Sequence, residues 1–108
     1  MRQSTAVLIV SIAQAMLAAQ LAHAGPVSYG GGDGGSFDAA IIVTGAMNEE
    51  EGILAEIAYV AKRHPDWRLG KSALMNKVGR TFDSNSYSAK DGSEHVMIFD
   101  VTGFFGKM

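Results

Sequence analysis

Residues 48–65 read NEEEGILAEIAYVAKRHP and carry the strongest secondary-structure signal in the chain. Asn48 can cap a helix with its side-chain oxygen, and Glu51 stands three residues later, as in an Asn version of the capping box. Three consecutive glutamates begin the segment and cations end it, which suits the helix dipole and a solvated first turn. Pro65 cannot continue a helix, because its ring lacks an N–H and clashes with the preceding turn. This pattern predicts a helix over residues 49–64.

The predicted helix has one mainly apolar stripe, whose members recur at three- and four-residue spacing. Such a stripe indicates the face that packs on the rest of the domain. Ile57 lies in the middle of it, so we expect Ile57 to be buried against a sheet. The stripe consists of Ile53, Leu54, Ile57, Val60, Ala61 and His64.

Four further segments are short, bounded by turn residues, and favour β-strand. Residues 39–44, AAIIVT, precede the helix, and residues 68–76, 81–89 and 94–102 follow it. The last of these contains HVMIFDV, apolar on both faces, which indicates a central strand. Residues 81–89 read TFDSNSYSA, which is polar enough for a sheet edge or a face in water. The order β-α-β-β-β predicts an α+β fold, with one helix packed on a mainly antiparallel sheet.

Residues 1–24 have the organisation of a secretory signal peptide. Arg2 gives a positive start, residues 6–22 are mostly apolar, and residues 22–24 (AHA) supply the small side chains that a signal peptidase requires. Two glutamines interrupt the apolar run, which argues against a permanent transmembrane helix. We therefore expect cleavage before Gly25, and a periplasmic or secreted protein without a stable membrane anchor.

Residues 25–36 read GPVSYGGGDGGS, and half of them are glycine. This composition opposes a fixed backbone, so we expect a flexible leader before a single domain at residues 37–108. Gly30, Gly32 and Gly35 match a dinucleotide-binding pattern, but that pattern needs a preceding strand and a following helix. The match is therefore no indication of a dinucleotide cofactor, and we predict none.

The chain carries nine basic and eleven acidic residues and no cysteine. Loss of Arg2 with the signal peptide would change the net charge from −2 to −3. An acidic balance offers no attraction for nucleic acid or an anionic membrane. The absence of cysteine excludes disulfides, thiol catalysis and Cys-ligated metal centres. A small exported domain of this kind must rely on its core, on a protein partner or on self-association.

No catalytic or metal-binding arrangement stands out in the sequence. Residues 70–72 read GKS, like the end of a phosphate-binding loop, but the required earlier glycine is missing and a strand follows. His64 and His95 form no paired metal motif, so a structural role is favoured for both. Ser84, His95 and Asp83 make a triad only on paper, because no nucleophile elbow supports it. We predict a non-enzymatic protein without cofactor or metal.

Three aromatic residues are the candidate partner-binding residues: Trp67, Phe104 and Phe105. Their alternative role is structural, with Trp67 covering the helix end and both Phe side chains closing the core. If residues 101–105 stay extended, Phe104 and Phe105 point to opposite faces of the sheet. One ring then remains exposed for a protein partner or a second copy.

The order of turn motifs after the helix carries a family resemblance. The helix ends at Pro65, the hairpins turn at residues 79–80 (GR) and 90–92 (KDG), and the last strand runs into residues 100–103 (DVTG). Over residues 49–103 the chain resembles the PepSY-like domains of bacterial secreted and periplasmic proteins, and the related β-lactamase-inhibitor-like fold. The resemblance implies a helix followed by an antiparallel meander, and a role in restraining proteases or binding proteins in the envelope. It implies no catalytic residues.

These observations favour a periplasmic interaction domain that inhibits or modulates an envelope protein. An alternative is a small-ligand-binding or self-associating envelope protein, which would expose a large apolar patch around the C-terminal Phe pair. An enzyme with a cryptic site would instead hold two convergent ionisable groups with perturbed pKa values in a concave pocket.

Overall fold

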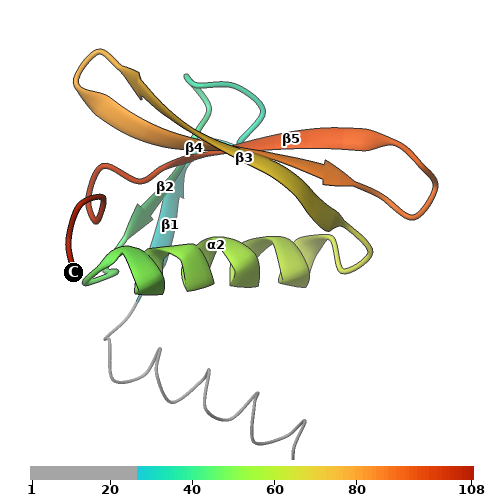
Figure 1. Ribbon diagram of the computed structural model, residues 1–108, viewed down its shortest axis with the longest axis horizontal. Helices are drawn as coiled ribbons and strands as arrows, with labels where there is room; N and C mark the ends of the chain where they lie inside the picture. Colours follow the sequence, from blue (N-terminus) through green and yellow to red (C-terminus); the bar gives the residue numbers. More distant parts are fainter. Residues whose placement is uncertain (1–26) are drawn as a thin grey trace, which may run out of the picture.

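The computed structural model describes residues 27–108, and the predicted signal peptide, residues 1–24, lies outside them. The described elements follow the order β-β-α-β-β-β (Figure 1). In this part of the chain, no helix is long and apolar enough to cross a membrane. The elements are β1 (Ser28–Gly31), β2 (Ile41–Thr44), α2 (Glu49–Arg63), β3 (Arg68–Lys77), β4 (Arg80–Ser88) and β5 (Glu94–Asp100).

The five strands form one sheet in the order β1-β2-β5-β4-β3. Strand β2 pairs with β5 in parallel, and the other neighbours pair antiparallel. Helix α2 lies along one side of this sheet, which confirms the predicted α+β fold (Figure 1). Strand β5 is central, as its apolar sequence predicts. Strand β4 is not at an edge, which was one of the two alternatives that its polar sequence left open, and the edge strand beside it is β3.

The glycine-rich segment differs from the flexible leader that its composition suggests, because Ser28–Gly31 forms strand β1. The Ser28 and Thr44 hydroxyls are hydrogen-bonded at 2.6 Å, and the Tyr29 hydroxyl donates to the Ala55 carbonyl at 2.7 Å. Gly31 has a φ of 78°, and a Cβ there would lie 2.3 Å from the Ala40 carbonyl oxygen. Glycine is thus required for the close return of the chain into β2.

Helix α2 begins as its sequence predicts. The Asn48 side-chain oxygen accepts a hydrogen bond from the Glu51 N–H at 2.9 Å. The Glu51 carboxylate accepts one from the Met47 N–H at 2.7 Å, one residue earlier than in a standard capping box. Arg63 is the last helical residue, and the chain then turns away at Pro65.

The face of α2 that packs on the sheet coincides with the predicted stripe only in part, because Val60 is buried but Ile57 is not. Ile57 is 52% exposed, so the expectation of a buried Ile57 was wrong. The rotation follows from the fit at the start of the helix, where a Cβ on Gly52 would lie 2.2 Å from the Phe104 ring. Small side chains bring that part of α2 close to the core, and Ile57 turns outward. The buried helix residues are Gly52, Ala55, Glu56 and Val60.

Two apolar clusters lie on the two faces of the sheet. The larger one fills the space between α2 and the sheet, and Phe99 is completely buried at its centre. The smaller one consists of Ala40, Phe82 and Ile98 with the partly buried Phe37 against it. Figure 1 shows the connection from β1 to β2 on the side of the sheet opposite α2.

Candidate functional site

A cleft of about 440 Å³ separates α2 from strands β3 and β4. Helix α2 approaches the sheet most closely at β2, because the small Gly52 and Ala55 lie at that end. Farther along the helix, the cleft opens between the two layers. Ile53 and Ile57 line one wall of the cleft, and Leu69 of β3 lines the other.

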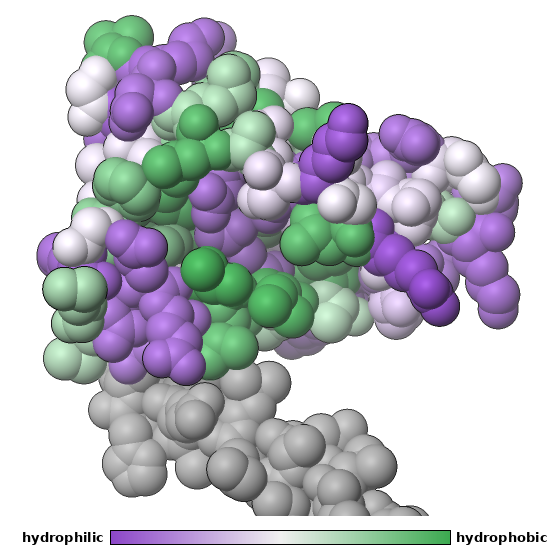
Figure 2. Space-filling view, in the orientation of Figure 1, coloured by the Kyte–Doolittle hydropathy of each residue, from purple (hydrophilic) through white to green (hydrophobic). Residues whose placement is uncertain are grey.

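The walls of the cleft are apolar and open to solvent. Ile53, Ile57 and Leu69 are each about half exposed, although they line a concave surface. Figure 2 shows hydrophobic side chains gathered over α2 on the face in view. A concave surface with exposed aliphatic side chains has the character of a binding site rather than of ordinary surface.

The floor of the cleft is polar and hydrogen-bonded. The Asn85 amide nitrogen donates to Glu56 Oε1 at 2.9 Å and to the Tyr87 hydroxyl at 3.2 Å. Its amide oxygen accepts from the Ser72 hydroxyl at 2.5 Å. Asn85 therefore has both ends fixed, and it orients the Glu56 carboxyl group. Asp83 lines the same floor.

Glu56 is the unusual residue of this floor. It is only 5% exposed, and its Oε2 atom has no hydrogen-bond partner among the described residues. Burial is the main cause that raises the pKa of Glu56, to about 9, and the neighbouring Asp83 raises it further against the effect of Asn85. At neutral pH the Glu56 carboxyl is therefore protonated.

Tyr87 shares this environment. Burial is the main cause that raises the pKa of Tyr87, with the carboxyl groups of Glu56 and Asp83 adding to it and the Asn85 hydrogen bond opposing it. The cleft thus holds two ionisable side chains with raised pKa values, the arrangement expected of a cryptic enzyme. That observation favours an acid–base function.

An aromatic stack closes one end of the cleft. The Trp67 indole lies between two imidazoles, with ring centroids 3.7 Å from His64 and 4.3 Å from His95. His64 and Trp67 both line the cleft. The His95 Nε2 atom is 2.8 Å from the Ser93 hydroxyl, which fixes that ring from behind. The sequence places these two histidines in separate elements, and the fold brings them together around Trp67.

The three predicted partner-binding residues do not form one surface. Trp67 lies beyond the C-terminal end of α2, whereas Phe104 packs on Gly52 near its start. Phe104 is buried and Phe105 is 43% exposed, so the two rings do have different environments. The reason differs from the predicted one, because the Phe104 and Phe105 N–H groups both donate to the Val101 carbonyl in a turn rather than a strand.

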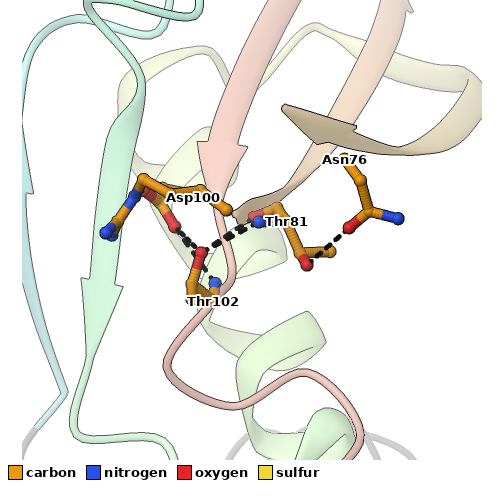
Figure 3. Close-up of polar contacts among 5 residues, drawn as sticks. Asn76, Thr81, Asp100 and Thr102 are labelled. Atoms are coloured by element: carbon orange, nitrogen blue, oxygen red, sulfur yellow. Dashed lines mark hydrogen bonds and ion pairs between the residues drawn. The ribbon is translucent and has the colours of Figure 1, made fainter. Parts of the chain in front are cut away.

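A second polar cluster lies where β5 ends, and it is internally satisfied (Figure 3). Asp100 pairs with Arg80 at 2.5 Å and accepts from the Thr102 hydroxyl at 2.6 Å. The Thr81 N–H donates to Thr102 Oγ1, and the Thr81 hydroxyl donates to Asn76. Burial acts to raise the pKa of Asp100, but the hydrogen bonds from Arg80 and Thr102 lower it overall. This cluster ties the ends of three strands together.

The triad considered on paper is not assembled. Asp83 and Ser84 are neighbours in β4, so their side chains point to opposite faces of the sheet. Asp83 faces the cleft and pairs in register with Phe99, whereas Ser84 pairs with Ile98 of the other face. No serine-based site therefore forms from these residues.

Sequence reasoning missed Glu56 and Asn85, although a signal was present. Asp83, Asn85 and Tyr87 alternate along one strand and mark a polar face. Glu56 follows Gly52 by one helical turn and precedes Val60 by another, which places it on the same face as two buried residues. A buried acid facing a polar strand could have been inferred from those two spacings.

No family model, no curated protein and no solved structure matches this chain.

Proposed function

We propose that this protein is an exported, non-enzymatic binding domain that holds a segment of a partner protein in the cleft between α2 and β3–β4. The carrying observation is that Ile53, Ile57 and Leu69 remain half exposed on opposite walls of a concave surface. Desolvation of such side chains by a partner is favourable, at roughly 25 cal/mol per Å² of apolar surface.

The sheet edge beside the cleft favours a protein segment as the occupant. Strand β3 is the last strand of the sheet, and all ten of its residues are exposed. Its outer edge pairs with no strand among residues 27–108. An extended partner segment could add to this edge through its backbone while placing side chains in the cleft. The resemblance to PepSY-like domains, which we also propose, agrees with such a role in the envelope.

A second candidate function is acid–base catalysis by Glu56 with Asp83. The shared floor and the raised pKa of Glu56 favour it. A pKa of about 9 makes Glu56 a weak acid, and its Oε1 atom is already held by Asn85. The Ser72 hydroxyl is also engaged by Asn85, and no lysine or arginine of the described chain lines the cleft to stabilise a developing negative charge. Binding is therefore the better-supported function.

Site-specific photo-crosslinking tests the proposal. The full chain would be expressed in an exporting bacterial cell with p-benzoylphenylalanine in place of Ile57, of Leu69 or, as a control, of Val78. Val78 is almost fully exposed in the turn between β3 and β4. We expect a discrete protein adduct from the two cleft positions and none from the control.

The other outcomes separate the alternatives. An adduct between two copies of this chain would indicate self-association instead of a distinct partner. Absence of any adduct from both cleft positions, with the control behaving identically, would contradict a protein-binding cleft. A small-molecule ligand would then be favoured, because a volume of about 440 Å³ lies within the usual range of such sites.

A further inference from the structure

The chemistry of the cleft floor specifies what the bound segment must carry. We infer that the cleft selects a lysine side chain of the partner, whose ammonium group is placed between the carboxyl groups of Glu56 and Asp83. This inference rests on the proposed function and adds the identity of the group that is recognised.

The charge of the cleft excludes an anion. Glu56 and Asp83 form its acidic floor, and none of the described residues that line it is lysine or arginine. Among the lining residues, the titratable groups that face Glu56 are His64 on α2 itself and Asp83 and Tyr87 on β4. Strand β3 contributes Leu69 and Ser72 to the lining and no charge. A second carboxylate or a phosphate would be repelled there, whereas a cation is attracted.

Once Glu56 has lost its proton, it has one free acceptor atom. Glu56 Oε2 is buried, lacks a partner and belongs to a residue of the cleft lining. Glu56 Oε1 is already occupied by the Asn85 amide, at 2.9 Å. A guanidinium group pairs best with both oxygens of one carboxylate, and Glu56 cannot offer both. An ammonium group is a compact donor that fits one oxygen from Glu56 and one from Asp83.

The walls match the rest of a lysine side chain. Ile53, Ile57 and Leu69 are aliphatic and half exposed, so they can cover a stem of four methylene groups while the charged head reaches the floor.

Binding then exchanges a proton for the ammonium group. The free protein holds a proton on Glu56 up to about pH 9, and that proton is released to the buffer when the ammonium group arrives. Glu56 becomes a carboxylate, and no covalent bond changes. Affinity should therefore increase as the pH rises from 7 toward 9, because Glu56 deprotonates more readily while lysine, with a pKa near 10.4, stays charged.

The test uses protein purified from cells that express the full chain and a blocked peptide, acetyl-Ala-Leu-Lys-Leu-Ala-amide. Matched peptides replace Lys with norleucine, acetyl-lysine or Arg. Binding is followed by NMR shifts of the backbone amides of residues 53–61 and 83–87, and proton release is measured by calorimetry in two buffers of different ionisation enthalpy. We expect the Lys peptide to bind about tenfold or more tightly than the other three, with proton release near one at pH 7.

Two variants of the same helix complete the design. Glu56→Gln keeps the Oε1 acceptor for Asn85 but removes the charge. It should lower the affinity for the Lys peptide about tenfold and abolish proton release. Glu50→Gln removes an exposed acid outside the cleft and should change neither. Thermal melts verify that both variants are folded.

Equal binding of the Lys and norleucine peptides, unaffected by Glu56→Gln, would overturn the lysine inference and leave an apolar protein-binding cleft standing. Tighter binding of the Arg peptide, or no binding of any peptide at the cleft amides, would overturn it as well. The proposed function fails separately, through the crosslinking experiment at Ile57 and Leu69.

Discussion

Gly52 and Phe104 make the closest contact between α2 and the C-terminal segment. A Cβ on Gly52 would lie 2.2 Å from two atoms of the Phe104 ring, which is itself buried. Alanine stabilises a helix interior by about 1 kcal/mol relative to glycine, but overpacking a core costs about 1–3 kcal/mol. Gly52→Ala should therefore lower the free energy of unfolding, as measured by urea denaturation.

A smaller side chain at position 104 provides the control. In a Phe104→Leu background the clash is relieved, so Gly52→Ala should be neutral or stabilising there. A stabilising effect of Gly52→Ala in the wild-type background would show that Phe104 does not pack on the helix in this way.

Glu56 makes stability depend on pH in a defined direction. Below about pH 4.5 its carboxyl is protonated in both the folded and unfolded states, whereas between 4.5 and about 9 only the unfolded state releases the proton. The folded-state pKa is raised, so Glu56 favours unfolding increasingly as the pH rises through that window. Glu56→Gln should thus melt at a higher temperature than wild type at pH 8. The difference should shrink toward pH 4.5.

A constant difference between Glu56→Gln and wild type from pH 4.5 to 8 would contradict a buried, protonated carboxyl. Glu50→Gln serves as the comparison, since Glu50 is exposed on the same helix.

Individual residues were predictable from sequence only where the cause is local. Asn48 and Pro65 act within one helical turn, and the structure places both at the ends of α2 as expected. The burial of Glu56 depends on Asn85, which is 29 positions away in the chain. A Glu inside an amphipathic helix is ordinarily exposed, so its position opposite a polar strand face could be recognised only with the strand register known.

At the scale of elements, α2 is rotated relative to its apolar stripe, and paired substitutions measure the rotation. Val60 is 5% exposed and Ile57 is 52% exposed. Val60→Ala should cost about 2 kcal/mol of unfolding free energy, and Ile57→Ala less than about 1 kcal/mol although it removes more atoms. A larger cost at Ile57 in urea denaturation would mean that the side of α2 that carries Ile57, and not the observed face, packs on the sheet.

The β3–β4 hairpin contains a strained turn. Val78 and Gly79 have φ angles of 51° and 76°, and such paired positive angles suit Asn-Gly far better than a β-branched residue. Val78→Asn should raise the free energy of unfolding by about 1 kcal/mol, the order of the left-handed penalty. Val78→Thr is β-branched and polar, so it should leave stability unchanged in the same urea titration. Equal gains from both variants would assign the effect to polarity and not to the backbone.

Strand β1 shows why the glycine-rich composition of residues 25–36 led to the wrong prediction of a flexible segment. Glycine-rich segments lose much backbone entropy on folding, and this favours disorder when nothing offsets it. Here Tyr29 reaches Ala55 of α2 and its ring lies 4.9 Å from that of Tyr59. One aromatic side chain and a tight return through Gly31 hold the strand in place, and both depend on partners far along the chain.

At the scale of the whole molecule, the C-terminal segment fixes the start of helix α2. The C-terminal segment returns to the start of α2, where the Gly106 N–H donates to the Glu49 carboxylate at 2.7 Å and the Glu49 N–H donates to Lys107 (Figure 1). Toward its other end, α2 stands across a cleft from β3 and β4. The sequence predicted the helix, four of the strands and the central position of β5. It did not predict the cleft, because a space between the helix and the sheet depends on how the two pack against each other in the folded chain.

The central claim is that this cleft lies over a desolvated, protonated carboxyl group. Carbon-13 NMR of the side-chain carboxyl of Glu56, in the labelled full chain, reports its protonation directly across a pH titration. The claim predicts a midpoint near pH 9, which the Asp83→Asn variant should lower because it removes the neighbouring carboxylate. A midpoint near 4.5, unchanged by Asp83→Asn, would show that Glu56 is solvated and would contradict the site described for this protein.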